Sequence, residues 1–140
     1  MNILYLGFFD SQIWRAEYPM AQGLKEAGNN LYFINYSEKR EILTDWLLLR
    51  DEIDLVFLQY GVGFHPKFLD LFVDIPLIFF ASEAALEDSI HILTTARKPD
   101  LVLAHSMETY NFCIANNLDV IRVNNGFNEQ FYYKIESDYL

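Results

Sequence analysis

Six short, nearly continuous apolar runs alternate with longer amphipathic stretches, and this alternation constrains the fold of the chain more than any other feature. Such runs are typical of strands in a parallel sheet that helices cover on both faces. Alternation of strand and helix predicts right-handed crossover connections. We therefore expect an α/β fold, with a doubly wound, mostly parallel six-stranded sheet in a single Rossmann-like domain. The predicted strands cover residues 3–9, 31–36, 54–60, 76–81, 100–105 and 119–123.

The segments between these runs carry the signals of helices and of helix ends. Asp10 or Ser11 can cap the first helix, and Gly28 can supply the left-handed residue at its end. The apolar stripe of this helix is Ile13, Ala16, Met20, Leu24 and Ala27. Further helices are expected over about 38–52, 65–72, 85–97 and 107–117. Six strands connected in this way suggest the order 3-2-1-4-5-6, with a crevice between the first and fourth strands.

Composition limits the classes of function. The chain has 140 residues and is 52% hydrophobic, enough for one domain with a real core. Its formal net charge is −10 and its ten Lys and Arg are scattered, which disfavours nucleic acid and anionic membranes as partners. No run approaches the roughly 18–20 apolar residues of a membrane span. The N-terminus lacks a signal-peptide pattern, and the lone Cys113, expected to be buried in a helix, suits a reducing compartment, so we expect a cytoplasmic protein.

Candidate binding residues follow the predicted strands, because parallel sheets bind ligands at the carboxyl ends of their strands. The first of these loops, residues 7–14, has neither a dinucleotide fingerprint nor the lysine of a phosphate loop. Its single Gly7 still allows a close approach of ligand to backbone, and Trp14 could stack on a sugar or other ring. For Asp10 a plain capping role is the more frequent one. The candidate binding residues are Gly7, Phe8, Asp10, Ser11, Trp14, Asp88, Ser106, Asn125 and Gly126.

Two residues are candidates for acid–base chemistry. Glu83 follows the fourth strand and is the best candidate for a general base, although a role in capping a helix fits it equally well. His105 ends the fifth strand, where a polar residue without a catalytic role is the more frequent case. The three histidines and the cysteine form no metal-ligand pattern, so we expect neither a metal nor a cofactor. Receiver domains and flavodoxins share the alternation of elements, but their characteristic site residues are missing here.

Several stretches, taken in order, resemble the N-terminal domain of GT-B glycosyltransferases, and most closely the bacterial glycosyltransferase-like proteins related to spore-maturation factors. Residues 1–7 and the helix containing 20–28 look like the start of that domain. Residues 98–106 resemble its strand with the pattern Pro-Asp-x-Val, and residues 119–131 resemble the stretch that closes it. One departure is Asn128, where the family more often has Asp.

The resemblance implies that residues 1–126 are the acceptor-binding half of a glycosyltransferase, and residues 127–140 a C-terminal tail or the start of an interdomain linker. A second domain would then bind the nucleotide-sugar donor, and Asn125 and Gly126 would lie at the floor of the cleft between the domains. Glu83, or less favourably His105, would polarise the acceptor hydroxyl, without a metal. Transfer is expected only where a second domain is present.

Two further functions remain open from the sequence. The alternative to a transferase half is a stand-alone binding or interaction module, whose aromatic segment 127–139 would contact a partner or a second copy in a dimer. A free-standing nucleotide-binding enzyme is a third hypothesis, weakened by the missing phosphate loop.

Overall fold

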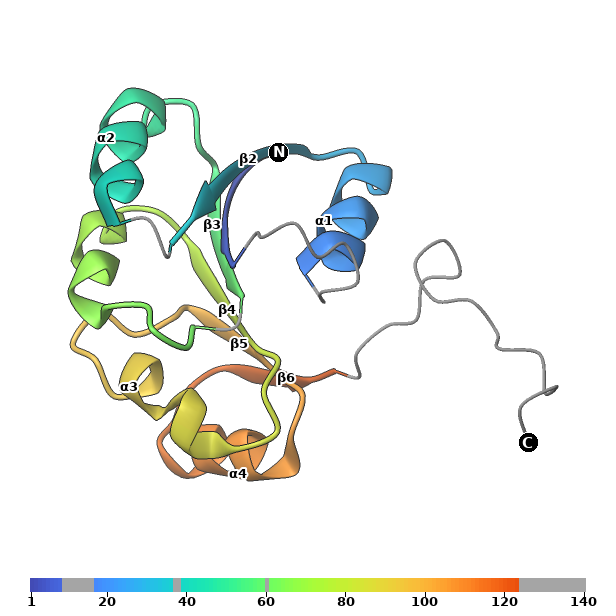
Figure 1. The fold of residues 1–140 in the computed structure, drawn as a ribbon. Helices are drawn as coiled ribbons and strands as arrows, with labels where there is room; N and C mark the ends of the chain where they lie inside the picture. Colours follow the sequence, from blue (N-terminus) through green and yellow to red (C-terminus); the bar gives the residue numbers. More distant parts are fainter. Residues whose placement is uncertain (9–16, 37–38, 60, 124–140) are drawn as a thin grey trace, which may run out of the picture.

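The computed structural model describes residues 1–8, 17–36, 39–59 and 61–123, and it contains one sheet of six parallel strands with helices between them (Figure 1). This arrangement confirms the predicted α/β, Rossmann-like fold class. The strands are β1 Asn2–Gly7, β2 Asn30–Asn35, β3 Leu55–Gln59, β4 Leu77–Ala81, β5 Leu101–Ala104 and β6 Val120–Arg122. The α-helices are α1 Glu17–Glu26, α2 Lys39–Leu49, α3 Ile90–Leu93 and α4 Met107–Ala115, and the 3₁₀ helices are η1 Pro66–Phe72 and η2 Leu86–Asp88.

The strands are arranged in the order β2-β1-β3-β4-β5-β6, so the predicted order 3-2-1-4-5-6 is wrong. β3 pairs directly with β1, with Ile3 opposite Leu55 and Leu6 opposite Leu58. Burial explains this arrangement, because all five residues of β3 are buried whereas β2 is mostly half-buried or exposed. A fully buried parallel strand needs neighbours on both sides, while β2 fits an edge. The reversal of strand order therefore lies between β1 and β3, and the predicted crevice between the first and fourth strands is wrong as well.

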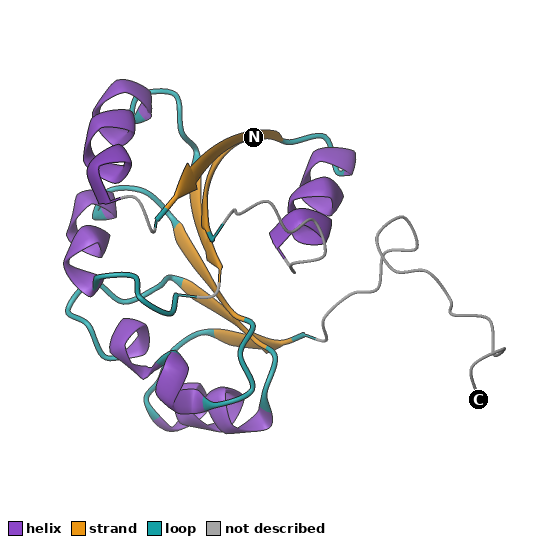
Figure 2. Cartoon of the chain, viewed as in Figure 1, coloured by secondary structure: helices purple, strands orange, loops and turns teal. Residues whose placement is uncertain are grey.

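Helices cover both faces of the sheet, as expected for a doubly wound domain (Figure 2). The larger core cluster lies between the sheet and the helices α2, η1, α3 and α4. Within it, the rings of Trp46 and Phe72 pack edge to face, with 4.9 Å between their centroids. The smaller cluster lies beneath α1 and includes Tyr5, Phe57 and Phe80 of the sheet with Ala21 of the helix. We call the side of the sheet that α1 covers the α1 face.

The helices agree with prediction in most positions, and the differences are at Ala27 and in the helix predicted over 85–97. Gly28 has a positive φ of 86° at the end of α1, as predicted, and Met20 and Leu24 of the predicted stripe pack on the sheet. Ala27 is exposed, so its predicted place in this stripe is wrong. Ile13 and Ala16 lie outside the described residues.

The helix predicted over 85–97 is instead divided into η2 and the four-residue α3. Thr94 ends α3, and its hydroxyl donates to the carbonyl of Ile90 at 2.8 Å. Beyond it, the side chain of Arg97 donates to the carbonyl of Ile75 at 2.9 Å, which ties this segment to the approach to β4.

Cys113 is buried in α4, as predicted, and burial raises the pKa of its thiol to about 11. A thiol in this environment is a packing residue rather than a nucleophile. Among the described helices, none has the length and apolar character that a membrane crossing requires.

Candidate functional site

The carboxyl ends of the six strands meet along one edge of the sheet, and the candidate residues of β1, β4 and β5 lie there. Gly7 is the last residue of β1, and its carbonyl accepts a hydrogen bond from the backbone N–H of Tyr36 at 3.2 Å. Phe8 follows and packs against the ring of Tyr36, with 6.5 Å between ring centroids. Phe8 therefore contributes to the core at this edge as well as to any ligand site.

Glu83 and His105 are brought into neighbouring loops. β4 and β5 are paired with Ala81 opposite Ala104, and the N–H of His105 donates to the carbonyl of Ala81 at 3.1 Å. The loops that follow the two strands therefore begin side by side. Both side chains are half-buried. The Nδ1 atom of His105 is shielded from solvent and has no hydrogen-bond partner among the described residues.

Ser106 serves as a helix cap. Its hydroxyl accepts from the N–H of Thr109 at 3.1 Å and contacts the hydroxyl of Thr109 at 3.0 Å. Both contacts satisfy groups at the start of α4, as the sequence pattern of a cap implies. Asp88 ends η2 and is half-buried. The remaining predicted binding residues, Asp10, Ser11, Trp14, Asn125 and Gly126, lie outside the described residues.

The reversal of strand order holds a buried polar group that the sequence analysis did not single out. The hydroxyl of Tyr5 in β1 donates to Oε1 of Gln59, the last residue of β3. The same hydroxyl lies 3.4 Å from the backbone carbonyl of Glu17, the first residue of α1. These three residues expose almost no surface. We refer to Tyr5, Gln59 and Glu17 as the switch-point group.

Electrostatics in the switch-point group follow from its burial. Burial raises the pKa of the Tyr5 hydroxyl well above its ordinary value, and the nearby Glu17 carboxylate raises it further. Tyr5 is therefore a neutral hydrogen-bond donor over the physiological pH range. The Nε2 atom of Gln59 is buried and has no partner among the described residues. One signal could have revealed this group: Gln59 is a polar residue that ends the otherwise apolar run Leu55–Leu58.

A tight glycine turn follows Gln59 on the same edge. Gly61 and Gly63 have φ of 77° and 78°, a region that favours glycine. The carbonyl of Gly61 lies 2.9 Å from Nε2 of His91 in α3, and a Cβ added at Gly61 would come 3.0 Å from the ring of Phe79. The Gly-x-Gly pattern, a weak signal in the sequence, is thus a turn just after Gln59 that is closely packed at Gly61 and open at Gly63.

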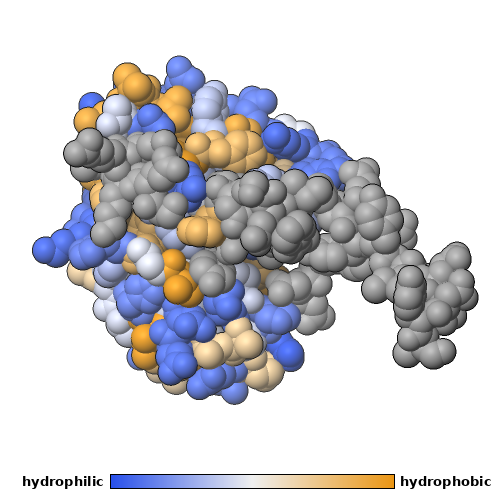
Figure 3. All heavy atoms as spheres, in the orientation of Figure 1, coloured by the Kyte–Doolittle hydropathy of each residue, from blue (hydrophilic) through white to orange (hydrophobic). Residues whose placement is uncertain are grey.

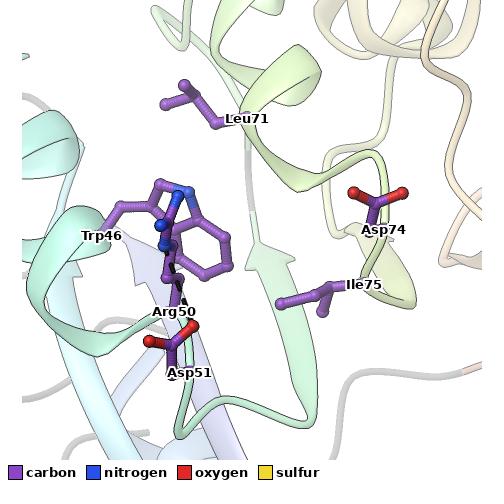
Figure 4. Close-up of a pocket in the computed structure, with 6 residues that line it drawn as sticks. All are labelled: Trp46, Arg50, Asp51, Leu71, Asp74 and Ile75. Atoms are coloured by element: carbon purple, nitrogen blue, oxygen red, sulfur yellow. Dashed lines mark ion pairs between the residues drawn. The ribbon is translucent and has the colours of Figure 1, made fainter.

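A cavity of about 300 Å³ lies away from all of these residues, at the amino edge of the sheet (Figure 4). Side chains from the end of α2 and the residues just after it, from η1, and from the connection between η1 and β4 line it. Arg50 pairs loosely with the exposed Asp51 at 3.8 Å. The lining residues are Trp46, Arg50, Asp51, Leu71, Asp74 and Ile75. None of them follows a strand, so the cavity lies apart from the edge where parallel sheets bind ligands.

Comparisons with known proteins give no match to any family model, curated protein or solved structure. Among the described residues, no group of three or more His, Cys, Asp or Glu side chains is placed to hold a metal ion. The carboxyl edge of β1, β3, β4 and β5 is therefore the candidate site on geometry alone.

Proposed function

We propose that this chain is the acceptor-binding half of a glycosyltransferase, which transfers a sugar from a nucleotide-sugar donor held by a second domain. The sequence stretches 1–7, 98–106 and 119–131 support this proposal through their resemblance to GT-B enzymes. An all-parallel Rossmann-like sheet is compatible with it. Fold alone does not assign function, so the proposal depends on the residues at the carboxyl edge.

The observation that carries the proposal is the placement of Glu83 and His105 in adjacent loops. A transferase must take a proton from the acceptor hydroxyl as its oxygen bonds to the anomeric carbon and the bond from that carbon to the donor phosphate breaks. A carboxylate or an imidazole in a half-buried position can accept that proton. Glu83 takes this role in the proposal, and His105 lies in the adjacent loop.

The test is transfer by the complete gene product, measured as release of nucleoside diphosphate from a panel of nucleotide-sugars with simple glycosides as acceptors. Glu83→Gln should lower the turnover by about 100-fold or more, the range in which general bases contribute. Glu87→Gln, a change of an exposed residue in η2, is the matched control and should leave turnover unchanged. Equal rates in these two variants would remove Glu83 from the role of base. Absence of transfer and of donor hydrolysis with every donor would overturn the proposal.

One observation favours the alternative, an interaction module without catalysis. Leu47 and Leu48 of α2 are 62% and 75% exposed, and hydrophobic surface is visible at the α2 end of the molecule (Figure 3). Exposed neighbouring leucines are typical of contact surfaces. If a second copy covers them, light scattering on the purified chain should give twice the mass of 16.5 kDa, and the double change Leu47→Lys and Leu48→Lys should restore the monomer mass.

A further inference from the structure

Two shielded polar atoms lie on the α1 face at the carboxyl edge, and neither has a hydrogen-bond partner among the described residues: Nε2 of Gln59 and Nδ1 of His105. The Gln59 side chain reaches Tyr5, which belongs to the cluster beneath α1. His105 directly follows β5, and its N–H still pairs with the carbonyl of Ala81 in β4, so the alternation of the strand extends to it and sets it on the same face as Leu103, another member of that cluster. The two atoms thus belong to the same side of the same edge.

Unpartnered polar atoms of this kind are rare in folded proteins. Each buried donor or acceptor without a partner costs about 1–3 kcal/mol, and most such groups are satisfied. For Gln59 the conclusion does not depend on which way the amide is turned, since either orientation leaves one end unpaired beside Tyr5. A bound molecule that supplies the missing partners would recover this cost.

The spacing of the two residues fits one small ligand. β4 lies between β3 and β5, and the register sets Gln59 level with Phe80 and Leu103. Gln59 and His105 are therefore separated by two strand spacings, about 10 Å, across the sheet and by two residues, about 7 Å, along it, roughly 12 Å in all. One glycoside with its substituents can span that distance. Leu6 of β1 pairs with Leu58 of β3, so Gly7 lies opposite Gln59 at the next position. Because Gly7 has no side chain, it leaves the space beside Gln59 open on this strand.

The charge of the switch-point group selects the kind of ligand. Glu17 is an acidic residue buried in the same group: the Tyr5 hydroxyl, which is bonded to Gln59, lies 3.4 Å from its backbone carbonyl. A phosphate or carboxylate at Gln59 would meet this negative charge in a buried setting, where repulsion is strong. A neutral hydroxyl can accept from the amide N–H without that penalty.

We propose that the α1 face of the carboxyl edge binds a neutral, polyhydroxylated molecule, with one hydroxyl bonded to Nε2 of Gln59 and another to Nδ1 of His105. This assignment rests on the proposed function, because it gives the acceptor its chemical class, a neutral glycoside or polyol. The donor diphosphate is excluded from this position. Gln59 is then a specificity residue, separate from the base Glu83.

The experiment is heteronuclear NMR of the chain, titrated with methyl glycosides of glucose, galactose and N-acetylglucosamine, and separately with inorganic phosphate. The side-chain NH₂ signals of Gln59 are assigned by their loss in Gln59→Leu. We expect at least one glycoside to shift the signals of both Gln59 and His105, and phosphate to shift neither. Gln59→Leu should weaken glycoside binding about 10-fold, the value of one hydrogen bond of 1.4 kcal/mol. Gln22→Leu, on the outer side of α1, is the matched control and should bind as the wild type does.

The outcomes separate this inference from the proposed function. A response of Gln59 to phosphate, or to none of the glycosides, would overturn the inference, even if the complete protein transfers sugar. Binding of glycosides at Gln59 and His105 without any transfer would uphold the inference and overturn the proposed transferase. Should Gln59→Leu fail to fold, the side-chain signals of Gln59 are assigned through its backbone resonances instead, and their response together with the binding affinity of His105→Asn decides the same question.

Discussion

The amino and carboxyl edges of the sheet differ in whether their polar side chains are fully hydrogen-bonded. At the amino edge, the Asp100 carboxylate accepts from the N–H of Leu77 at 2.7 Å and from Arg97 at 2.8 Å, and Asp54 accepts from the N–H of Asn2 at 2.8 Å. At the carboxyl edge, Gln59 and His105 each retain an atom without a described partner. The comparison teaches that the amino edge uses its polar side chains to hold the strands together, while two polar atoms of the carboxyl edge are left without a described partner and are the ones assigned to the proposed ligand.

Arg97 is the centre of the amino edge. Its guanidinium donates to the carbonyl oxygens of Phe72 and Ile75, at 3.2 and 2.9 Å, and it pairs with Asp100 at 2.8 Å. It therefore joins the end of η1, the approach to β4 and the approach to β5. Its side chain is only 14% exposed, so these contacts are largely protected from water.

The largest expected effect comes from removing this centre. Arg97→Ala should lower the free energy of unfolding by about 3 kcal/mol, because the contacts of a mostly buried guanidinium with Phe72, Ile75 and Asp100 are lost together. Urea denaturation followed by circular dichroism measures this change. Arg50→Ala is the matched control, since Arg50 is 58% exposed and makes only a loose ion pair, and its effect should stay below about 0.5 kcal/mol. Similar losses in both variants would contradict the role given to the amino edge.

The glycine turn at the carboxyl edge tests whether that edge is also tightly packed. Gly61→Ala combines an unfavourable positive φ with a Cβ placed 3.0 Å from Phe79, and it should lower the free energy of unfolding by about 2 kcal/mol. Gly63→Ala has the same φ strain but no atom within 4 Å, so about 1 kcal/mol is expected. Thermal unfolding of the two variants measures the difference. Equal values would mean that the contact with Phe79 does not matter.

The switch-point group gives a smaller effect with a distinctive pattern. Tyr5→Phe should lower the free energy of unfolding by about 1 kcal/mol, because it leaves the Gln59 amide without any described partner. Combining it with Gln59→Leu removes both polar groups, and the double variant should be close to the wild type in stability. A double-mutant cycle in urea measures this coupling. If the losses in free energy of unfolding from the two single changes simply add in the double variant, the Tyr5–Gln59 hydrogen bond does not contribute to stability.

Much of the fold was predictable because hydrophobic pattern and local capping determine it. The apolar runs gave every strand to within two residues, and Gly28 and Ser106 marked a helix end and a helix start as they were expected to. Strand order was not obtained, because it depends on pairing between distant segments. The difference in burial between β2 and β3 was nevertheless visible in the sequence. β2 begins with Asn30 and ends with Asn35, whereas β3 is apolar from Leu55 to Leu58.

The site was predictable only in part for the same reason. Knowing where the strands end was enough to predict that Glu83 and His105 lie at the carboxyl edge, where the structure has them; their role as a site stays a prediction. The switch-point group was missed because it needs the pairing of β1 with β3, which brings Tyr5 and Gln59 together across 54 residues of sequence. Tyr5 also has an aromatic ring that packs on Phe57 at 5.0 Å, so its sequence pattern is that of a core residue.

The smallest expected effect concerns pH, and it sharpens the description of the amino edge. The hydrogen bond from Arg97 holds the pKa of Asp100 below its ordinary value, so the folded state favours the ionised carboxylate. The resulting stabilisation is fully present above the pKa of an unfolded aspartate, about 3.9, and is lost as the pH falls through the lower folded-state pKa. The stability difference between the wild type and Asp100→Asn should therefore be constant from pH 7 to about 5 and shrink below about pH 4. Urea denaturation at a series of pH values measures it, and the same comparison in the Arg97→Ala background should show a weaker dependence on pH. A difference that stays constant down to pH 2 would mean that the charge of Asp100 does not contribute, and that its hydrogen bond to Leu77 alone secures the edge.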